Sequence, residues 1–165
     1  PLRTVRDRAA LRAGVADGTI DVVCSDHAPV DDDAKQVPFG EAEPGATGLE
    51  LLLPLTLKWA AEDNVPLVDA LARITSAPAR LMERDAGTLA PGAEADLCIF
   101  DPQAWWTVER SALRSQGKNT PFLGLEVPDP ALKRKRIIIV KRTNPSRTKP
   151  FIIHLKGCAG KLIGR

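Results

Sequence analysis

Several stretches of the chain carry apolar residues at the three- and four-residue spacing of an amphipathic helix. After the first stretch, Gly18 is suited to the C-terminal cap of the helix. Pro54 falls in the first or second turn of the second stretch, or at a kink in it. Asn64 is a candidate cap for the third. The pattern predicts helices over residues 3–17, 48–62, 66–75 and 78–84.

Shorter apolar runs around these helices have the composition of strands. Thr19–Cys24 is rich in β-branched residues, which predicts a buried strand directly after the first helix. Residues 87–92 predict two turns around a short strand, and residues 95–101 and 105–108 predict two further strands. A helix, a short turn and a buried strand in this order are typical of an α/β protein.

Composition narrows the class of protein without deciding its function. Hydrophobic residues make up 44% and charged residues 27% of the 165 residues, as in ordinary soluble domains. We expect neither a membrane span nor a signal peptide, because the sequence has no long apolar run and no apolar segment after its first arginines. Three widely spaced cysteines suggest no disulfide framework and no zinc ribbon, which favours the cytoplasm as the location.

The sharpest candidate site follows the predicted strand over residues 19–24. A carboxylate at the carboxyl end of a buried parallel strand, here Asp26, can bind a metal or move protons over a pocket. The alternative is that Asp26 caps the next turn, and the spacing alone does not separate the two interpretations. His27 points away from Asp26 if the extended chain continues, so we expect a structural role for it.

Three further motifs give weaker signals. Asp31–Asp33 could attract a hard cation, but three consecutive carboxylates do not face one ion easily, so we interpret them as a solvated loop tip. Pro44–Gly48 is a glycine-rich turn at the start of a predicted helix, where backbone amides can bind an anion. Trp105 and Trp106 could form a stacking platform, but alternation along a strand places one ring in the core.

Taken together, several stretches resemble the class I dihydroorotases of the amidohydrolase superfamily. Cys24–Pro29, Glu43–Glu50 and Lys118–Gly124 are dihydroorotase-like, whereas Ser76–Leu81 with Gly87–Leu97 is typical of the wider superfamily. The resemblance covers residues 1–128 and makes the chain similar to a C-terminal fragment of such an enzyme. Allantoinases and hydantoinases are the nearest competing cyclic amidohydrolases.

The resemblance implies a fold and an activity. The fold is the C-terminal part of a (β/α)8 metal-dependent hydrolase barrel in residues 1–84, with part of a small β-sandwich domain in residues 85–128. The activity is the reversible cyclisation of N-carbamoyl-L-aspartate to dihydroorotate in pyrimidine biosynthesis, with zinc as cofactor. Asp26 matches the carboxylate that contacts the metal and transfers a proton, and Pro44 and Gly45 match the loop whose backbone binds the substrate.

Two departures from the family pattern change these expectations. Val30 stands where a substrate-binding histidine usually follows the Asp-His-Ala-Pro motif. The alternative function is therefore a non-catalytic dihydroorotase-like subunit that assembles with aspartate carbamoyltransferase, and a homo-oligomer is a second assembly to consider. The remaining zinc ligands of the family precede the matched segment, so we expect the isolated chain to be inactive and poorly folded.

The last part of the sequence has a different character. Residues 1–128 hold 12 basic and 20 acidic side chains, whereas residues 129–165 hold 11 basic side chains and one carboxylate. Residues 129–165 do not resemble the closing strands of the family, so we interpret them as the product of a frame shift or fusion rather than as a lineage-specific extension. We expect no nucleic-acid binding, because this basic tail has one aromatic residue and no recognition motif.

Overall fold

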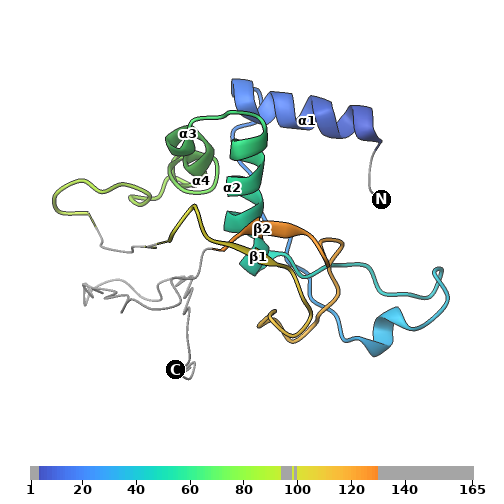
Figure 1. Ribbon diagram of the computed structural model, residues 1–165. Coiled ribbons are helices and arrows are strands. Elements are labelled where there is room, and N and C mark those ends of the chain that lie inside the picture. The colour runs from blue at the N-terminus through green and yellow to red at the C-terminus, as the bar shows by residue number, and fades with distance from the viewer. Residues whose placement is uncertain (1–3, 94–97, 99, 130–165) are drawn as a thin grey trace.

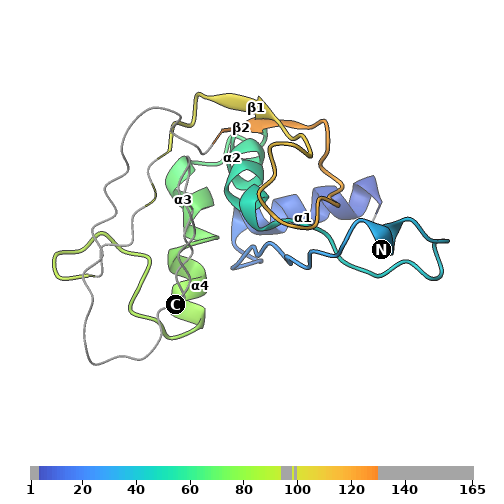
Figure 2. The same cartoon turned by 90° about the horizontal axis from the view of Figure 1, so that it is seen from below.

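A computed structural model describes residues 4–93, 98 and 100–129 of the chain. A central helix lies across the end of a long N-terminal helix, two short helices pack at its side, and a two-stranded sheet lies near its N-terminal end (Figure 1, Figure 2). In chain order the elements are α1 (Val5–Asp17), η1 (Asp33–Lys35), η2 (Leu49–Leu51), α2 (Leu52–Glu62), α3 (Leu67–Ala72), α4 (Ser76–Leu81), β1 (Trp105–Thr107) and β2 (Glu126–Pro128).

Helix α1 has well-defined signals at both ends. The Thr4 hydroxyl accepts a hydrogen bond from the Asp7 N–H at 3.2 Å, and the Asp7 carboxylate accepts one from the Thr4 N–H at 3.0 Å. This reciprocal capping box satisfies two backbone donors at the start of the helix. Gly18 ends the helix at φ 91°, a left-handed conformation that glycine adopts easily. The predictions of this helix and of its glycine cap are confirmed.

The second predicted helix is confirmed as a 3₁₀ turn, η2, that continues into α2. Pro54 is the third residue of α2, where its missing N–H costs no helical hydrogen bond. The third and fourth predicted helices are also present. α3 (Leu67–Ala72) is shorter than predicted, and α4 (Ser76–Leu81) begins and ends before its predicted bounds. Asn64 has φ 55° and does not cap α3, which begins after Pro66, so that prediction is wrong.

Of the predicted strands, one is confirmed and others are not. Residues 105–108 contain β1, which pairs antiparallel with β2, with Trp106 opposite Val127. Thr19–Cys24 forms no strand in the described chain, so that prediction is wrong. A strand needs a neighbouring strand with which it can form a ladder of hydrogen bonds. The Val23 N–H instead donates to the Arg73 carbonyl at 3.0 Å. Residues 87–92 are also irregular. The strand predicted over residues 95–101 falls largely outside the described residues.

One small hydrophobic core joins the two halves of the described chain. Leu51 at the start of the central helix packs with Val108, Leu113 and Val127 around β1 and β2. Partly buried apolar residues surround this cluster: Leu55, Trp106, Phe122 and Leu125. Trp106 is thus the ring of the tryptophan pair that belongs to the core, as predicted, while Trp105 remains half exposed.

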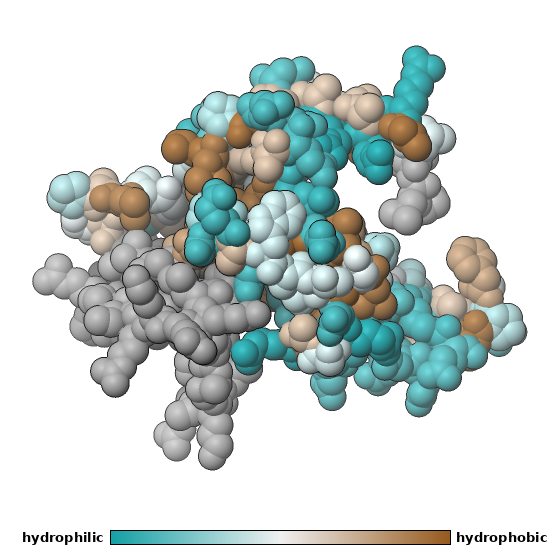
Figure 3. Space-filling view, viewed as in Figure 1, coloured by the Kyte–Doolittle hydropathy of each residue, from teal (hydrophilic) through white to brown (hydrophobic). Residues whose placement is uncertain are grey.

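Large apolar side chains also remain at the surface. Val5 of α1 is 73% exposed, Phe39 in the loop before η2 is 99% exposed, and α1 buries none of its residues. Figure 3 shows apolar residues at separate places over the visible face. The residues in the described ranges therefore bury few of their apolar faces against one another. No helix among them has the length and apolar content needed to cross a membrane.

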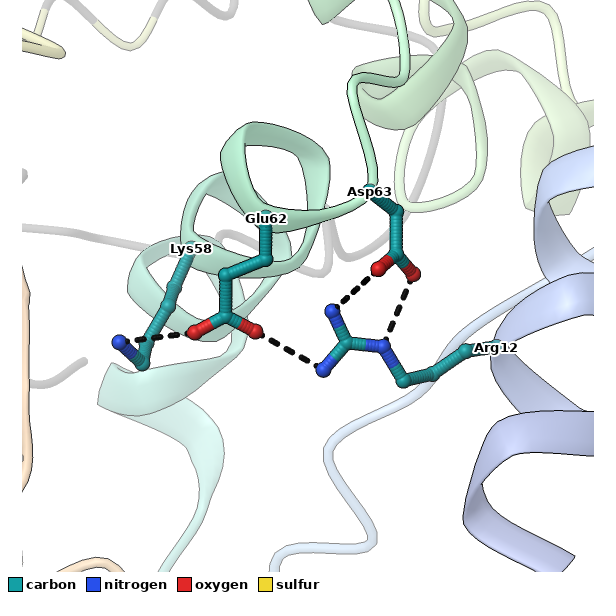
Figure 4. Close-up of polar contacts among 4 residues, drawn as sticks. All are labelled: Arg12, Lys58, Glu62 and Asp63. Atoms are coloured by element: carbon teal, nitrogen blue, oxygen red, sulfur yellow. Dashed lines mark hydrogen bonds and ion pairs between the residues drawn. The ribbon is translucent and has the colours of Figure 1, made fainter. Parts of the chain in front are cut away.

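A network of ionic contacts holds α1 against the C-terminal end of α2 (Figure 4). The Arg12 guanidinium donates from Nε and NH2 to the Asp63 carboxylate at 2.8 and 2.6 Å, and from NH1 to Glu62 at 2.8 Å. Lys58 pairs with the other Glu62 oxygen at 2.9 Å. Hydrogen bonding from Arg12 lowers the pKa of Asp63, and Lys58 followed by Arg12 lowers the pKa of Glu62. In return, these carboxylates raise the pKa of Arg12.

We expect Arg12→Ala to loosen the docking of α1 and to speed amide hydrogen exchange over residues 5–17 by about two- to threefold, the size of effect for one exposed ion pair. The folded-state pKa of Asp63 is lowered, so the stabilisation is present above the usual carboxyl pKa and is lost as the pH falls through the lowered value. Exchange of the variant and the parent, compared by mass spectrometry at the same pH, should differ at pH 7 and converge once the pH has fallen below the lowered pKa of Asp63. Arg8→Ala is the matched control, and an equal effect from it would contradict this account.

Candidate functional site

The segment that contains Asp26 lies against two other segments of the chain, residues 45–48 and the stretch around residue 117. The segments approach one another at three glycines. A Cβ atom added to any of these glycines would meet a backbone oxygen atom of residues 25–30. A Cβ on Gly48 would lie 2.6 Å from the Ser25 oxygen, one on Gly45 would lie 2.5 Å from the Ala28 oxygen, and one on Gly117 would overlap the Val30 oxygen. Residues 45–48 and residue 117 therefore approach residues 25–30 at backbone distance.

Hydrogen bonds connect the three segments. His27 and Ala46 form an isolated parallel bridge, and the Ala28 N–H donates to the Ala46 carbonyl at 3.0 Å. Thr47 is fully buried, its N–H donates to the Asn119 carbonyl at 2.7 Å, and its hydroxyl donates to the Gly117 carbonyl at 2.6 Å. Because a buried polar group needs such partners, Thr47 fixes the middle segment to the segment around residues 117–119.

Asp26 occupies a distinctive position in this arrangement. Its φ is 44°, in the left-handed region that aspartate and asparagine visit more readily than most residues. The side chain is exposed, and among the described residues its carboxylate accepts no hydrogen bond and forms no ion pair. The alternative that Asp26 caps the following turn is therefore not supported, and the carboxylate is free to meet a ligand.

The glycine-rich turn over residues 44–48, in which Ala46 bridges to His27, the neighbour of Asp26, presents free backbone groups. Gly45 has φ 120°, and its carbonyl accepts a hydrogen bond from the Asn119 side-chain amide at 3.2 Å. Within the described ranges, the Gly45 N–H and the Pro44 carbonyl make no hydrogen bond. The peptide between Pro44 and Gly45 can therefore offer one donor and one acceptor to a small polar molecule.

Two side chains of this region, His27 and Glu50, bind backbone N–H groups that lie far away in the sequence. For His27 this agrees with the structural role expected from the sequence. His27 Nδ1 accepts hydrogen bonds from the Gly48 and Leu49 N–H groups, each at 3.2 Å. Glu50 accepts three hydrogen bonds of 2.9–3.0 Å from the backbone N–H groups of Arg114 and Ser115. Their partners lie 21 to 65 residues away, so nothing in the local sequence pattern marks them.

Two of the remaining motifs, Asp31–Asp33 and the tryptophan pair, have other partners among the described residues. Asp32 is paired with Arg110, which agrees with a structural loop rather than a cation site for Asp31–Asp33. Lys58 lies 5.7 Å from the centre of the Trp105 ring, so that ring is partly covered by a cation. Residues 130–165, which hold nearly all of the predicted basic tail, lie outside the described residues.

The described residues do not form a complete metal site. They contain no group of three or more His, Cys, Asp or Glu side chains placed to hold a metal ion. Zinc sites in proteins use three or four protein ligands, and a carboxylate oxygen is one accepted type. Asp26 therefore suits zinc as a single ligand, and the described part of the chain does not complete the site.

Comparison with known proteins bears on this arrangement. The sequence pattern of the amidohydrolase family matches residues 2–132, which leaves residues 133–165 outside the match. The chain belongs to the amidohydrolase family. The match contains Asp26, the Pro44–Gly45 turn and the segment around Asn119, so the residues brought together above all belong to the family's part of the sequence.

Individual relatives show which members of the amidohydrolase family this chain resembles. It is 46% identical over 124 residues to a dihydroorotase of Geotalea daltonii, and 47% identical over 122 residues to one of Syntrophotalea carbinolica. These alignments cover 75% and 74% of this chain but 29% of each relative, so the chain spans about three tenths of their length. The dihydroorotase-like character predicted from the sequence motifs is confirmed.

Solved structures give a consistent result. A D-hydantoinase from a Thermus species superposes with a TM-score of 0.71 at 26% identity, over 78% of this chain and 29% of the other. The architecture is thus shared with a D-hydantoinase over most of this chain, which supports the α/β fold class predicted from the sequence. The short β1–β2 pair and the irregular residues 19–30 show only a small part of the predicted sheet.

Proposed function

We propose that this amidohydrolase forms part of the active site of a dihydroorotase, which interconverts dihydroorotate and N-carbamoyl-L-aspartate. The observation that carries the proposal is Asp26, an exposed carboxylate without a protein partner among the described residues, in a left-handed conformation. The next residue, His27, bridges to Ala46 in the loop that contains the free peptide of Pro44 and Gly45. The confirmed likeness to dihydroorotases supports it. In this proposal residues 1–84 belong to the end of a (β/α)8 barrel and residues 85–128 to a small β-domain.

The proposal gives Asp26 the part of a general base and acid. During ring opening the carboxylate accepts a proton from the attacking water, and it returns the proton to the ring nitrogen as the carbon–nitrogen bond breaks. The Gly45 N–H would donate to a carbonyl or carboxylate oxygen of the substrate, and the Pro44 carbonyl would accept from a ring N–H. When bound, zinc would lower the pKa of water and polarise the amide carbonyl, with Asp26 as one ligand.

Val30 motivates a second candidate function. Its apolar side chain cannot pair with a carboxylate, and a Cβ on Gly117 would overlap its backbone oxygen, so this stretch is closely packed. The second candidate is a non-catalytic dihydroorotase-like subunit that scaffolds aspartate carbamoyltransferase, and a homo-oligomer is also compatible. The likeness to a D-hydantoinase supports a related cyclic ureide as the alternative substrate. The cytoplasmic location stays a prediction.

A hybrid enzyme tests the proposal. Residues 2–132 of this chain would replace the matching segment of the Geotalea daltonii dihydroorotase, which supplies the rest of the protein. We expect the purified, zinc-loaded hybrid to open dihydroorotate, followed by the loss of its ultraviolet absorbance, and to prefer it over hydantoin. A folded, zinc-loaded hybrid with no turnover would contradict the proposal.

Val30→His in the same hybrid separates the two candidates. If Val30 alone disables a catalytic site, this substitution should restore turnover to a hybrid that lacks it, because histidine can pair with a substrate carboxylate. A hybrid that stays inactive with histidine at this position would favour the scaffolding role. Co-purification with aspartate carbamoyltransferase would then be the measurement that supports it.

A further inference from the structure

Two side chains, those of His27 and Asn119, make hydrogen bonds to the backbone of residues 45–49. We propose that His27 and Asn119 are positioning residues, which set the place of the Pro44–Gly45 peptide relative to Asp26. This inference rests on the proposed function, because it concerns the loop that would bind the substrate. It goes beyond that function by naming residues that do not touch the substrate and yet control its binding.

His27 acts at the start of the helix that follows the loop. The first N–H groups of a helix have no partner within it, and Gly48, the residue at the N-cap, has no side chain to satisfy them. His27 Nδ1 accepts from both the Gly48 and the Leu49 N–H groups at 3.2 Å. Nδ1 is thus the unprotonated nitrogen of the ring, and a residue 21 positions away in the sequence serves as the cap.

Asn119 acts on the other side of the same loop. Its side-chain amide donates to the Gly45 carbonyl at 3.2 Å, and its own carbonyl accepts from the Thr47 N–H at 2.7 Å. The two contacts enclose Ala46, whose carbonyl accepts from the Ala28 N–H at 3.0 Å. The Gly45–Ala46 peptide is therefore fixed in orientation, while the preceding Pro44–Gly45 peptide keeps its polar groups free.

These contacts define the spacing between the two halves of the proposed site. Asp26 directly precedes His27, and Gly45 directly precedes Ala46, the two residues joined by the parallel bridge. A single isolated bridge is weak, so the side-chain contacts of His27 and Asn119 add to the alignment that the bridge and the buried Thr47 provide. If they are lost, the loop can shift relative to Asp26, and substrate binding should suffer more than proton transfer.

A matched pair of substitutions in the hybrid enzyme tests this. In His27→Asn the side-chain oxygen can occupy the place of Nδ1, whereas His27→Gln moves the amide to the place of Nε2 and leaves the two N–H groups without an acceptor. We expect His27→Gln to speed hydrogen exchange at the Gly48 and Leu49 amides by about fivefold, the effect of one lost hydrogen bond, and His27→Asn to leave it nearly unchanged. Exchange is followed by nuclear magnetic resonance without substrate.

Kinetics supply the second measurement. His27→Gln should raise KM for dihydroorotate about tenfold and leave kcat within about twofold, while His27→Asn should restore the parental KM. Asn119→Asp keeps the shape of the side chain but removes the donor to Gly45, and it should raise KM in the same way while the Thr47 amide stays protected.

The outcomes separate this inference from the proposed function. Faster exchange in His27→Gln with an unchanged KM would overturn the positioning role, as would equal effects from His27→Asn and His27→Gln. A parental hybrid without turnover would refute the proposed function, and the exchange comparison between the two variants would then decide by itself whether His27 holds the loop.

Discussion

Replacing Asp26 with asparagine in the hybrid dihydroorotase is expected to lower kcat by about a thousandfold, within the usual range for loss of a general acid–base group. The reason is that the carboxamide can neither take the proton from water nor return it to the ring nitrogen. Asparagine is the informative substitution because it tolerates a φ of 44° almost as well as aspartate does. Alanine there would add backbone strain to the chemical loss.

Asp31→Asn is the matched control for this measurement. It removes one carboxylate from the neighbouring loop, where the side chain is exposed and has no partner in the described chain, and it should leave kcat within about twofold. Circular dichroism and the thermal midpoint should be alike for both variants. An Asp26→Asn enzyme that keeps more than about a tenth of the parental kcat would remove Asp26 from the mechanism.

Gly45→Ala is expected to be the most damaging single substitution in the loop, with a loss of about 2–5 kcal/mol in the free energy of unfolding of the hybrid. Two causes add. An L-residue is strained at φ 120°, and the new Cβ would lie 2.5 Å from the Ala28 backbone oxygen, which cannot turn aside as a flexible side chain can. Thermal and urea unfolding measure the loss, and KM for dihydroorotate should rise with it.

Substitutions at two other glycines separate the cost of backbone strain from the cost of steric overlap. Gly124 has φ 79° but open space around its Cβ position, so Gly124→Ala reports the conformational cost, about 1–2 kcal/mol. Gly40 has open space and no left-handed φ, so Gly40→Ala should be close to neutral. If Gly45→Ala costs no more than Gly124→Ala, the close approach between the loop and residue 28 is not significant for stability.

Local patterns predicted the helices of this chain well. Residues 5–17 carry a capping box and a C-terminal glycine, so the formation of this helix depends mainly on nearby sequence. Residues 49–62 follow the helical period of apolar residues, but the cap at their start comes from His27, which is 21 residues away from Gly48. The strand predicted over Thr19–Cys24 failed because a β-branched run indicates an extended backbone but not the neighbour that would make a ladder. β2 was missed because three residues ending in Pro128 give almost no periodic signal.

The candidate site could be predicted only in part. Asp26 was proposed as a site residue from its place after a predicted strand and from its motif, and Pro44 and Gly45 were proposed because they stand in a motif that resembles one of a known family. These roles stay predictions. The roles of His27 and Asn119 were not found, since their partners are 21 and 74 residues away and a single sequence contains no record of such contacts. Sequence alternation did place His27 apart from Asp26, which agrees with its contacts to the next helix.

The contacts that residues 25–30 make with the loop and with Gly117 have a consequence for inheritance. The boundary expected after residue 84 separates Asp26 from the chain that lies against it, because Gly117 approaches the Val30 backbone and Asn119 holds the loop. A recombination event that transferred residues 1–84 alone would carry the carboxylate but not its support. Recombinants that keep a working site should therefore carry both segments from one parent.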